Sequence, residues 1–287
     1  MIEIRDIYWV PICFAVFLLI SHSVQSLDTV KQDTLKIVIP PLEPSAKNHS
    51  AFFPKLLDLV LDKTSDEFGS FRIDFYSKLF TNGRFLTELK HGNIINVMWT
   101  MTSPKRETEL LPIPISLLKG LNSHRVFLIL QNRQDQFHRV KTLDDLRQYK
   151  AGVGVHWPNR GILERNGIPT VTSTHYELLF DMLKSRRFDY YPRGLYEVWD
   201  EQKVHAADGV VVEDSIMLKY HAPIYFFVNR RDTALAHRIE LGLKRAMEDG
   251  SFDALFNSIP GFSRGLRELQ NNNRRIFKLR VEENGEN

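Results

Sequence analysis

Four common catalytic or cofactor-binding motifs are absent from this sequence. The spacings G-x-x-x-x-G-K-[ST], H-E-x-x-H, C-x-x-C and G-x-G-x-x-G are all absent from the chain. Gly152 and Gly154 make only a fragment of a glycine-rich loop, and the ten histidines lack metal-ligand spacing. We therefore expect no catalytic residue, no cofactor and no metal site.

The remaining candidates are arginines, hydroxyls and aromatic side chains in segments between apolar runs. Arg106 ends the stretch TMTSPKR, which also holds Thr100 and Thr102. A guanidinium forms bidentate pairs with carboxylates that lysine cannot reproduce, and loops carry a large share of binding residues. Arg106 is thus either an anion-binding residue or a solvated loop arginine.

The composition around these candidates is that of an ordinary globular protein. The chain has 287 residues, of which 43% are hydrophobic and 25% charged, and its formal net charge is +3. A disordered chain or a polytopic membrane protein would have a different composition, and the small net charge does not indicate nucleic-acid binding. A disulfide framework is excluded because Cys13 is the only cysteine. The length allows one large domain or two smaller ones.

The N-terminus has the pattern of a secretory signal peptide. An apolar run of 14 residues, Ile7 to Ile20, follows Arg5, and small residues at Val24 and Ser26 suit cleavage after Ser26. The run is too short to span a bilayer comfortably, although an uncleaved anchor is the alternative. Cys13 lies inside the run, so we expect no lipid anchor.

The first part of the mature chain alternates short β-type runs with helical patterns. This order is typical of an α/β protein with a parallel sheet and covering helices. Asn82 is the expected N-cap of the second helix and Gly92 its C′ residue. The predicted elements are LKIVI (Leu35–Ile39), a helix near Phe52–Asp62, FRIDFY (Phe71–Tyr76), a helix over Gly83–His91 and IINVMW (Ile94–Trp99).

A second series of the same kind starts near residue 123. TLDD (Thr142–Asp145) and THYE (Thr174–Glu177) have the form of capping boxes, so each is expected to open a helix. After this series come a strand, an amphipathic helix that ends at Gly250, and a helix from Ser251. From Ser263 onward the low apolar content predicts a loose polar tail. The predicted strands are RVFLILQ (Arg125–Gln131), AGVGV (Ala151–Val155), PTVTS (Pro169–Ser173), GVVV (Gly209–Val212) and IYFFV (Ile224–Val228).

The order of several segments resembles the bacterial extracellular solute-binding proteins of family 3, the amino-acid-binding type, over nearly all of residues 35–260. The segments that carry the resemblance are LKIVI, ELKHGNIINVMW (Glu88–Trp99), TMTSPKRE (Thr100–Glu107), KTLDDLRQYKAGVGV (Lys141–Val155), RFDYYP (Arg187–Pro192) and MEDGSFDALF (Met247–Phe256). The resemblance implies a two-lobed periplasmic binding fold of type 2. Each lobe would be a mixed sheet with flanking helices, and two hinge strands would join the lobes.

The resemblance also implies a division of the chain. Residues 1–26 are the expected signal peptide, and residues 263–287 the expected polar C-terminal tail. Lobe 1 is expected to be discontinuous, formed by residues 27–123 and 221–262, with lobe 2 at 124–220 between its parts. The hinge strands are expected near 122–128 and 220–227.

In that family an arginine after a Thr-x-Thr segment binds the carboxylate of the solute. The match places Arg106 in this role, with Thr100 and Thr102 beside it, although the segment here is one residue longer. After GVGV the family has Gly-Thr or Gly-Ser at a helix start, whereas this chain has Trp157 and Asn159 nearby. Asn159 is expected to cap that helix. Trp157 is expected either to stack on the solute or to serve the core.

The family's aspartate for the ligand ammonium has no counterpart here, because Tyr190 or Arg193 lies nearest that position. Arg193 would make the site favour an acidic solute if it faced the cleft beside Arg106. The alternative is a pair between Arg193 and Glu197, one turn later on the following helix. Aromatic residues near the presumed cleft are either an apolar floor or core, namely Phe52, Phe53, Trp99 and Tyr190.

These observations predict an exported, periplasmic protein that captures a small polar, acidic solute by hinge closure of two lobes. The expected partners are this carboxylate-bearing solute and the membrane subunits of an ABC importer, with no nucleic acid, and the expected state is a monomer. One alternative is a partner of a membrane sensor. A dehydratase-like enzyme on the same fold is a further alternative, but no acid and base pair supports it.

Overall fold

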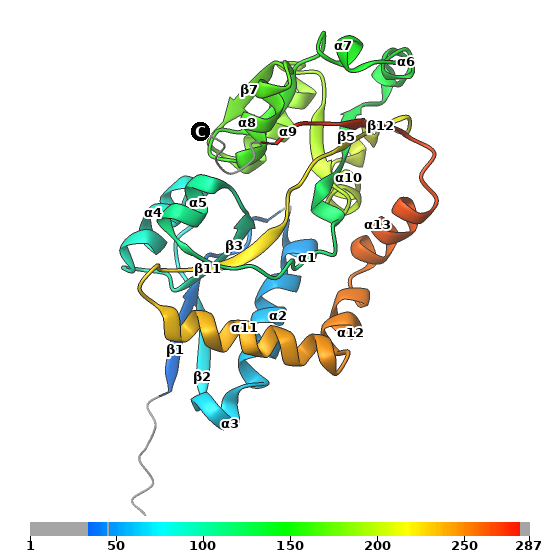
Figure 1. Cartoon of the computed structure of the whole chain (residues 1–287). Coiled ribbons are helices and arrows are strands. Elements are labelled where there is room, and N and C mark those ends of the chain that lie inside the picture. Colours follow the sequence, from blue (N-terminus) through cyan, green and yellow to red (C-terminus); the bar gives the residue numbers. More distant parts are fainter. Residues whose placement is uncertain (1–33, 45, 282–287) are drawn as a thin grey trace, which may run out of the picture. The chain divides into compact units, whose positions relative to one another are not determined.

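The structure, a computed structural model, describes residues 34–44 and 46–281. The predicted signal peptide lies outside the described residues. Within the described part, no helix combines the length and the apolar character that crossing a membrane requires. The described residues form mixed α/β structure in two groups of sheets, which we call lobe 1 and lobe 2 (Figure 1).

Lobe 1 contains two small sheets. Strand β1 (Leu35–Ile39) pairs in parallel with β2 (Phe71–Phe75). Strand β11 (Ile224–Val228) lies between β3 (Val97–Met101) and β4 (Leu111–Ile113) and is antiparallel to both. The helices of this lobe are α1 (Lys47–Ser50), α2 (Phe52–Asp62), α3 (Ser65–Phe68), α4 (Asn82–His91), α5 (Pro104–Glu109), α11 (Thr233–Glu248) and α12 (Ser251–Asn257).

Lobe 2 contains a five-stranded sheet with the order β12-β10-β5-β8, in which β9 also pairs with β5. A parallel pair, β6 and β7, completes the lobe. The strands are β5 (His124–Leu130), β6 (Ala151–Gly154), β7 (Thr170–Ser173), β8 (Tyr191–Gly194), β9 (Val210–Val212), β10 (Ile216–Lys219) and β12 (Arg275–Lys278). The helices are η1 (Leu121–Ser123), η2 (Gln131–Arg133), α6 (Gln134–His138), α7 (Leu143–Leu146), α8 (Pro158–Arg165), α9 (Tyr176–Lys184), α10 (Val198–Val204), η3 (Ala206–Asp208) and α13 (Pro260–Gln270).

Two segments that connect the lobes are hydrogen-bonded to each other. The side chain of Asn122 donates to the carbonyl of Ala222 at 2.6 Å. The backbone N–H groups of Tyr220 and Ala222 donate to the carbonyl and hydroxyl oxygens of Ser123, both at 3.1 Å. These residues lie at the ends of the two hinge ranges expected from the sequence. That they act as the hinge stays a prediction.

Most of the predicted strands and helices are confirmed within one or two residues, but three expected caps are wrong. Helix α4 is capped by Thr81, whose hydroxyl accepts from Arg84, so Asn82 already lies inside the helix. The N-cap residue of α9 is His175 rather than Thr174. Trp157 precedes α8, which puts Asn159 in its first turn. The capping box at Thr142 is present.

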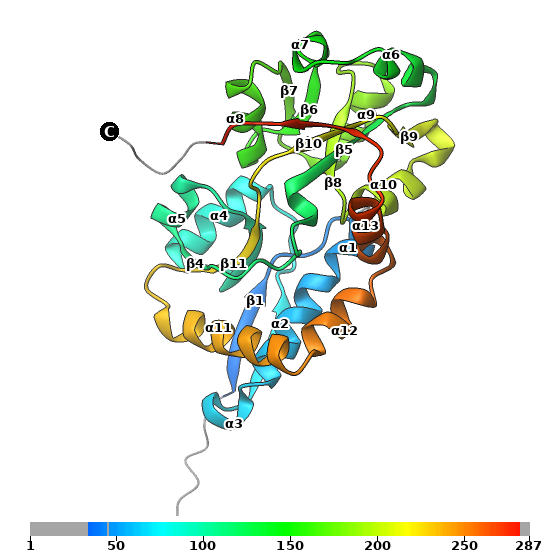
Figure 2. The same ribbon diagram turned by 45° about the vertical axis from the view of Figure 1, so that its right-hand side comes forward.

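The loose tail expected from Ser263 is wrong for residues 263–281. Helix α13 continues to Gln270, and β12 then pairs in parallel with β10 (Figure 2). Helix α13 has few apolar residues, yet they lie on one face: Phe262 is fully buried, and Leu266 and Leu269 pack against the core. Backbone pairing with β10 supplies the hydrogen bonds of β12, which side-chain composition alone does not reveal.

The packing of α2 against α11 depends on a glycine. Buried residues of α2 recur with helical spacing, and α11 crosses α2 and packs against it (Figure 1). A Cβ atom added to Gly242 would lie 2.0 Å from the carbonyl oxygen of Val60, so the two backbones approach more closely than any side chain permits.

We expect Gly242→Ala to destabilise the protein by about 1–3 kcal/mol, because the two helices must separate to admit a methyl group. The free energy of unfolding from urea titration measures the effect. The control is Gly161→Ala in α8, where the added Cβ would meet only the flexible end of Arg165. That change should be neutral or stabilising by up to about 1 kcal/mol. Equal effects of the two substitutions would contradict the packing described here.

Candidate ligand-binding site

Side chains of both lobes and of the connecting segments line a cavity of about 180 Å³. Lobe 1 contributes residues from α1, α2, β3 and α5, and lobe 2 contributes residues from α8, α9, β8 and the segment that follows β8. The residues of the sequence prediction that line it are Trp99, Thr100, Arg106, Trp157, Asn159 and Arg193. Phe53 also lines it, with its ring stacked on that of Trp99 at 5.2 Å between centroids. The cavity is of the size of a small metabolite.

Arg106 is buried in the wall of this cavity, and every hydrogen-bond acceptor recorded for its guanidinium is neutral. Nη1 donates to Thr100 Oγ1 and to the carbonyl of Met101, both at 2.6 Å. Nη2 donates to the carbonyl of His156 at 2.9 Å and to Asn82 Oδ1 at 3.4 Å. Burial lowers the pKa of Arg106 to about 10, which leaves it charged at neutral pH. Among the described residues, no carboxylate forms an ion pair with it.

Arg193 lines the same cavity and also forms ion pairs. The two alternatives for this residue, facing the cleft and pairing with Glu197, therefore both apply. Its Nε and Nη2 donate to the two carboxylate oxygens of Glu201 at 2.7 and 2.6 Å. Nη2 also lies 2.7 Å from Glu197 Oε2. The Arg193–Glu197 pair expected from the four-residue spacing is present, but it is buried rather than solvated. Glu201 was not expected from the sequence.

Arg125 completes a buried charge network with these residues. Its Nη1 lies 3.3 Å from Glu197 Oε1, which also accepts from the backbone N–H of Gly194 at 2.8 Å. Burial acts to raise the pKa of Glu197, but Arg193 and Arg125 outweigh it and hold that pKa below its usual range. Arg125 and Arg193 therefore balance Glu197 and Glu201. The guanidinium of Arg106 adds one formal positive charge to this part of the wall.

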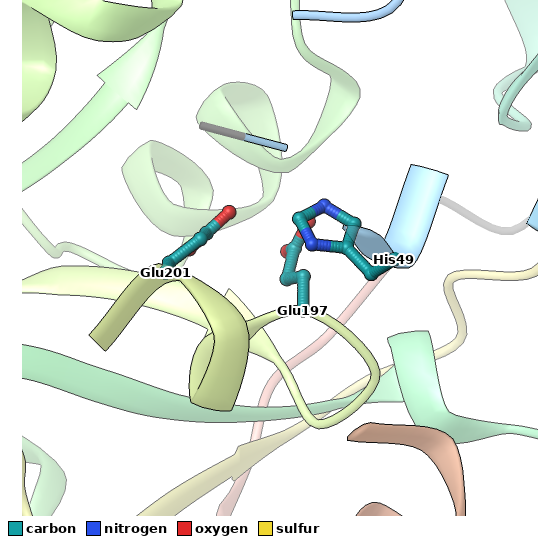
Figure 3. Close-up of side chains that lie close together, drawn as sticks. All are labelled: His49, Glu197 and Glu201. Atoms are coloured by element: carbon teal, nitrogen blue, oxygen red, sulfur yellow. The ribbon is translucent and has the colours of Figure 1, made fainter. Parts of the chain in front are cut away.

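His49, Glu197 and Glu201 are close enough for their side chains to be considered as metal ligands. One ligand atom from each lies within 4.8 Å of the others, and Figure 3 shows His49 from α1 facing the two glutamates near the start of α10. Both carboxylates already accept hydrogen bonds or ion pairs from arginine. A divalent cation would thus lie beside two guanidinium groups. This arrangement fits a carboxylate pair compensated by arginine better than a metal site.

Three predicted site residues lie outside the cavity lining. Phe52 is fully buried and packs edge-on against Phe262 at 4.9 Å, because it lies one residue, about 100° of helix rotation, from Phe53. Tyr190 is fully buried against Phe127. Thr102 donates its hydroxyl to Glu107 Oε1 at 2.6 Å. Phe52 and Tyr190 thus follow the core alternative, and Thr102 lies outside the lining of this cavity, whose role as the binding site stays a prediction.

Several solved structures are similar to this chain in fold. An ancestral arginine-binding protein bound to arginine is 16% identical with a TM-score of 0.61, covering 79% of this chain and 98% of that one. The chain has the fold of the periplasmic binding proteins. The ancestral amino-acid-binding protein described as a precursor of cyclohexadienyl dehydratase is 17% identical, with a TM-score of 0.58 and coverage of 79% and 95%. A histidine kinase sensor domain with similarity to periplasmic binding proteins is 14% identical, with a TM-score of 0.60 and coverage of 80% and 97%. No protein-family model and no curated protein matches the sequence.

The two-lobed periplasmic binding fold expected from the sequence is thereby confirmed. Within it, the sequence reasoning missed several residues that line the cavity. Arg125 had a detectable signal, because it is a charged residue at the start of an otherwise apolar strand. His49 and Glu43 had none, since His49 lies in the four-residue helix α1 and Glu43 in the loop before it. Tyr196 and Glu197 follow β8 directly, where open α/β sheets commonly bind ligands.

The segment GFSRG (Gly261–Gly265) has the G-x-S-x-G spacing of a hydrolase nucleophile. Such a serine acts from a sharp turn between a strand and a helix. Ser263 instead lies inside α13, and its hydroxyl donates to the carbonyl of Asn257 at 3.1 Å. The spacing is therefore not a catalytic motif in this fold.

We expect the stability of the protein to fall as the pH drops below 6.5, partly because of His49. Burial lowers the pKa of His49 from its ordinary value of 6.5, although Glu201 and Glu197 oppose this. Below pH 6.5 the unfolded chain therefore binds more protons at this position than the folded protein, which favours unfolding. Urea titrations at about pH 7.5 and pH 5.5 should show a smaller loss in His49→Gln than in the wild type. Identical losses in the two proteins would contradict this role of His49.

Proposed function

We propose that this protein binds a small carboxylate-bearing solute in the cavity and does not transform it. The observation that carries the proposal is the guanidinium of Arg106, buried in the cavity wall and held only by neutral acceptors. Leaving a buried cation without an anion costs several kcal/mol, so the cavity is suited to an occupant that supplies the anion. A carboxylate forms the strongest planar pair with a guanidinium.

The charges and the size of the cavity support an acidic solute of about amino-acid size. Three arginines in or beside the wall face two buried glutamates, which leaves one positive charge for the solute to neutralise. Glu43 also lines the cavity, with a pKa raised by burial and by Glu177, and among the described residues it forms no ion pair with Arg106. The stacked rings of Phe53 and Trp99 offer an apolar surface beside Arg106.

Binding at Arg106 would be coupled to closure of the lobes. The guanidinium belongs to lobe 1, and its hydrogen bond to the carbonyl of His156 reaches lobe 2. A solute that contacts both lobes stabilises the closed form because its full set of contacts exists only there. The same chemistry serves capture for an ABC importer or presentation to a membrane sensor. Both roles imply export to the periplasm, as the expected signal peptide does.

Uptake is the role we favour, and sensing is the second candidate because a histidine kinase sensor domain shares the fold. Either role is tested by the same first experiment, a thermal-shift screen of the mature protein. Amino acids, dicarboxylates, sugar acids and polyamines are the probes. A ligand at 100 times its dissociation constant should stabilise the protein by about 2.7 kcal/mol. The absence of any shift with the carboxylate-bearing probes would contradict the proposed function.

We expect Arg106→Lys to weaken binding of the carboxylate-bearing hit by roughly 10- to 100-fold. Lysine keeps the charge but loses the bidentate hydrogen bonds, worth about 1.5–3 kcal/mol. Isothermal titration calorimetry measures the change in dissociation constant.

The matched control for this change is Arg238→Lys. Arg238 is also a buried arginine with carbonyl acceptors, but it lies on α11 outside the cavity lining. Its substitution should lower the stability of the protein and leave the affinity unchanged. If Arg106→Lys binds the solute as tightly as this control does, Arg106 does not bind the carboxylate.

A further inference from the structure

The guanidinium of Arg193 is enclosed in the manner in which proteins enclose a bound organic cation. Three aromatic rings surround it, with centroids 5.2, 5.4 and 4.6 Å from its central carbon, and they belong to Trp157, Tyr176 and Tyr191. Two carboxylates, those of Glu197 and Glu201, face its N–H groups. Aromatic faces and carboxylates together form a cation-binding pocket.

We propose that Arg193 fills a guanidinium-binding pocket from within the chain and thereby excludes solutes with a cationic side chain. The second part rests on the proposed function, because it assigns a solute to the adjoining cavity. The pocket is complete without any other group. Glu201 is fully buried, takes both hydrogen bonds of a bidentate pair from Arg193, and also accepts from the hydroxyl of Tyr176.

Two other buried arginines of the chain have fewer partners of this kind: the ring of Tyr220 lies near Arg125, and the rings of Phe68 and Phe71 lie near Arg238. Arg125 has one carboxylate at 3.3 Å, and its Nε has no hydrogen-bond partner among the described residues. Arg238 donates to Thr64 Oγ1 and to backbone carbonyls, with no ion pair recorded within the described ranges. The combination of aromatic rings with two carboxylates is therefore particular to Arg193 rather than general to buried arginines here.

The pocket adjoins the cavity. Trp157, Tyr176, Glu197 and Arg193 itself belong to the cavity lining, whereas Glu201 lies behind Arg193 and outside that lining. Shortening Arg193 would join the pocket to the cavity and present Glu201 to its interior. In the intact protein, a solute's ammonium or guanidinium group would meet the like charge of Arg193 at this place. The wild-type cavity is thus suited to anionic or neutral side groups.

The test is chemical rescue of Arg193→Ala. About 20 mM guanidinium chloride, far below denaturing concentrations, should raise the melting temperature of this variant by a few degrees. The wild type should show no rise, because its pocket is filled. Urea, which has the same planar shape without the charge, and sodium chloride at equal ionic strength should not stabilise the variant. Removing the bidentate acceptor in Arg193→Ala/Glu201→Gln should abolish the rescue.

A refolding experiment covers the case in which Arg193→Ala does not fold unaided. The variant is then diluted from denaturant into buffer with guanidinium or with urea. Recovery of folded protein with guanidinium alone supports the proposal, and equal or no recovery in the two buffers overturns it. For a variant that folds, the absence of a specific guanidinium effect on its melting temperature overturns it as well.

The exclusion of cationic solutes has its own measurement. L-arginine should stabilise Arg193→Ala but not the wild type, and stabilisation of the wild type by L-arginine overturns the exclusion. These outcomes are distinct from a failure of the proposed function, because guanidinium rescue needs no natural solute. The proposed function fails instead when the carboxylate-bearing probes give no shift or when Arg106→Lys keeps the wild-type affinity.

Discussion

The structure depends on how the chain compensates arginine charge that is buried between its two lobes. Three guanidinium groups lie in or beside one cavity, and each has a different environment. Arg193 has two carboxylates and three aromatic rings, Arg125 has one carboxylate at 3.3 Å, and Arg106 has neutral oxygen acceptors. Desolvation would be costly for all three. This unequal compensation makes the charge distribution of the cavity wall uneven, with the remaining positive charge at Arg106.

This uneven charge compensation separates two roles, which are to hold one lobe together and to connect the two lobes. The compensated network at Arg193 holds together β8, α9 and α10, all elements of lobe 2. Arg106, by contrast, belongs to lobe 1 and contacts lobe 2 through one backbone carbonyl of His156. The charge of Arg193 is therefore compensated within lobe 2, whereas Arg106 has neutral acceptors in lobe 1 and one in lobe 2. If the proposed function holds, an anion bound at Arg106 would have more effect on the approach of the lobes than one bound at Arg193.

The sequence predicts the elements of this fold well and the site only in part. Phe52 and Phe53 show why: their apolar spacing predicts α2 correctly, yet it does not tell which of the two faces the cavity. The Arg193–Glu197 pair follows from a local spacing, whereas the ion pair of Glu197 with Arg125 and its proximity to His49 join residues far apart in the chain. The pairing of β12 with β10 is equally non-local. Local patterns thus determine helices and strands, and only the assembled fold determines which charges meet.

The return of the C-terminal segment to lobe 2 has a practical consequence. Helix α11 packs on α2 in lobe 1, whereas β12 pairs with β10 in lobe 2. The last part of the described chain therefore belongs first to lobe 1 and then to lobe 2. Fluorophores attached near the end of α11 and near the end of β12 would report on different lobes, although only about thirty residues of sequence separate them. The end of β12 is therefore a natural place to attach one half of an energy-transfer biosensor.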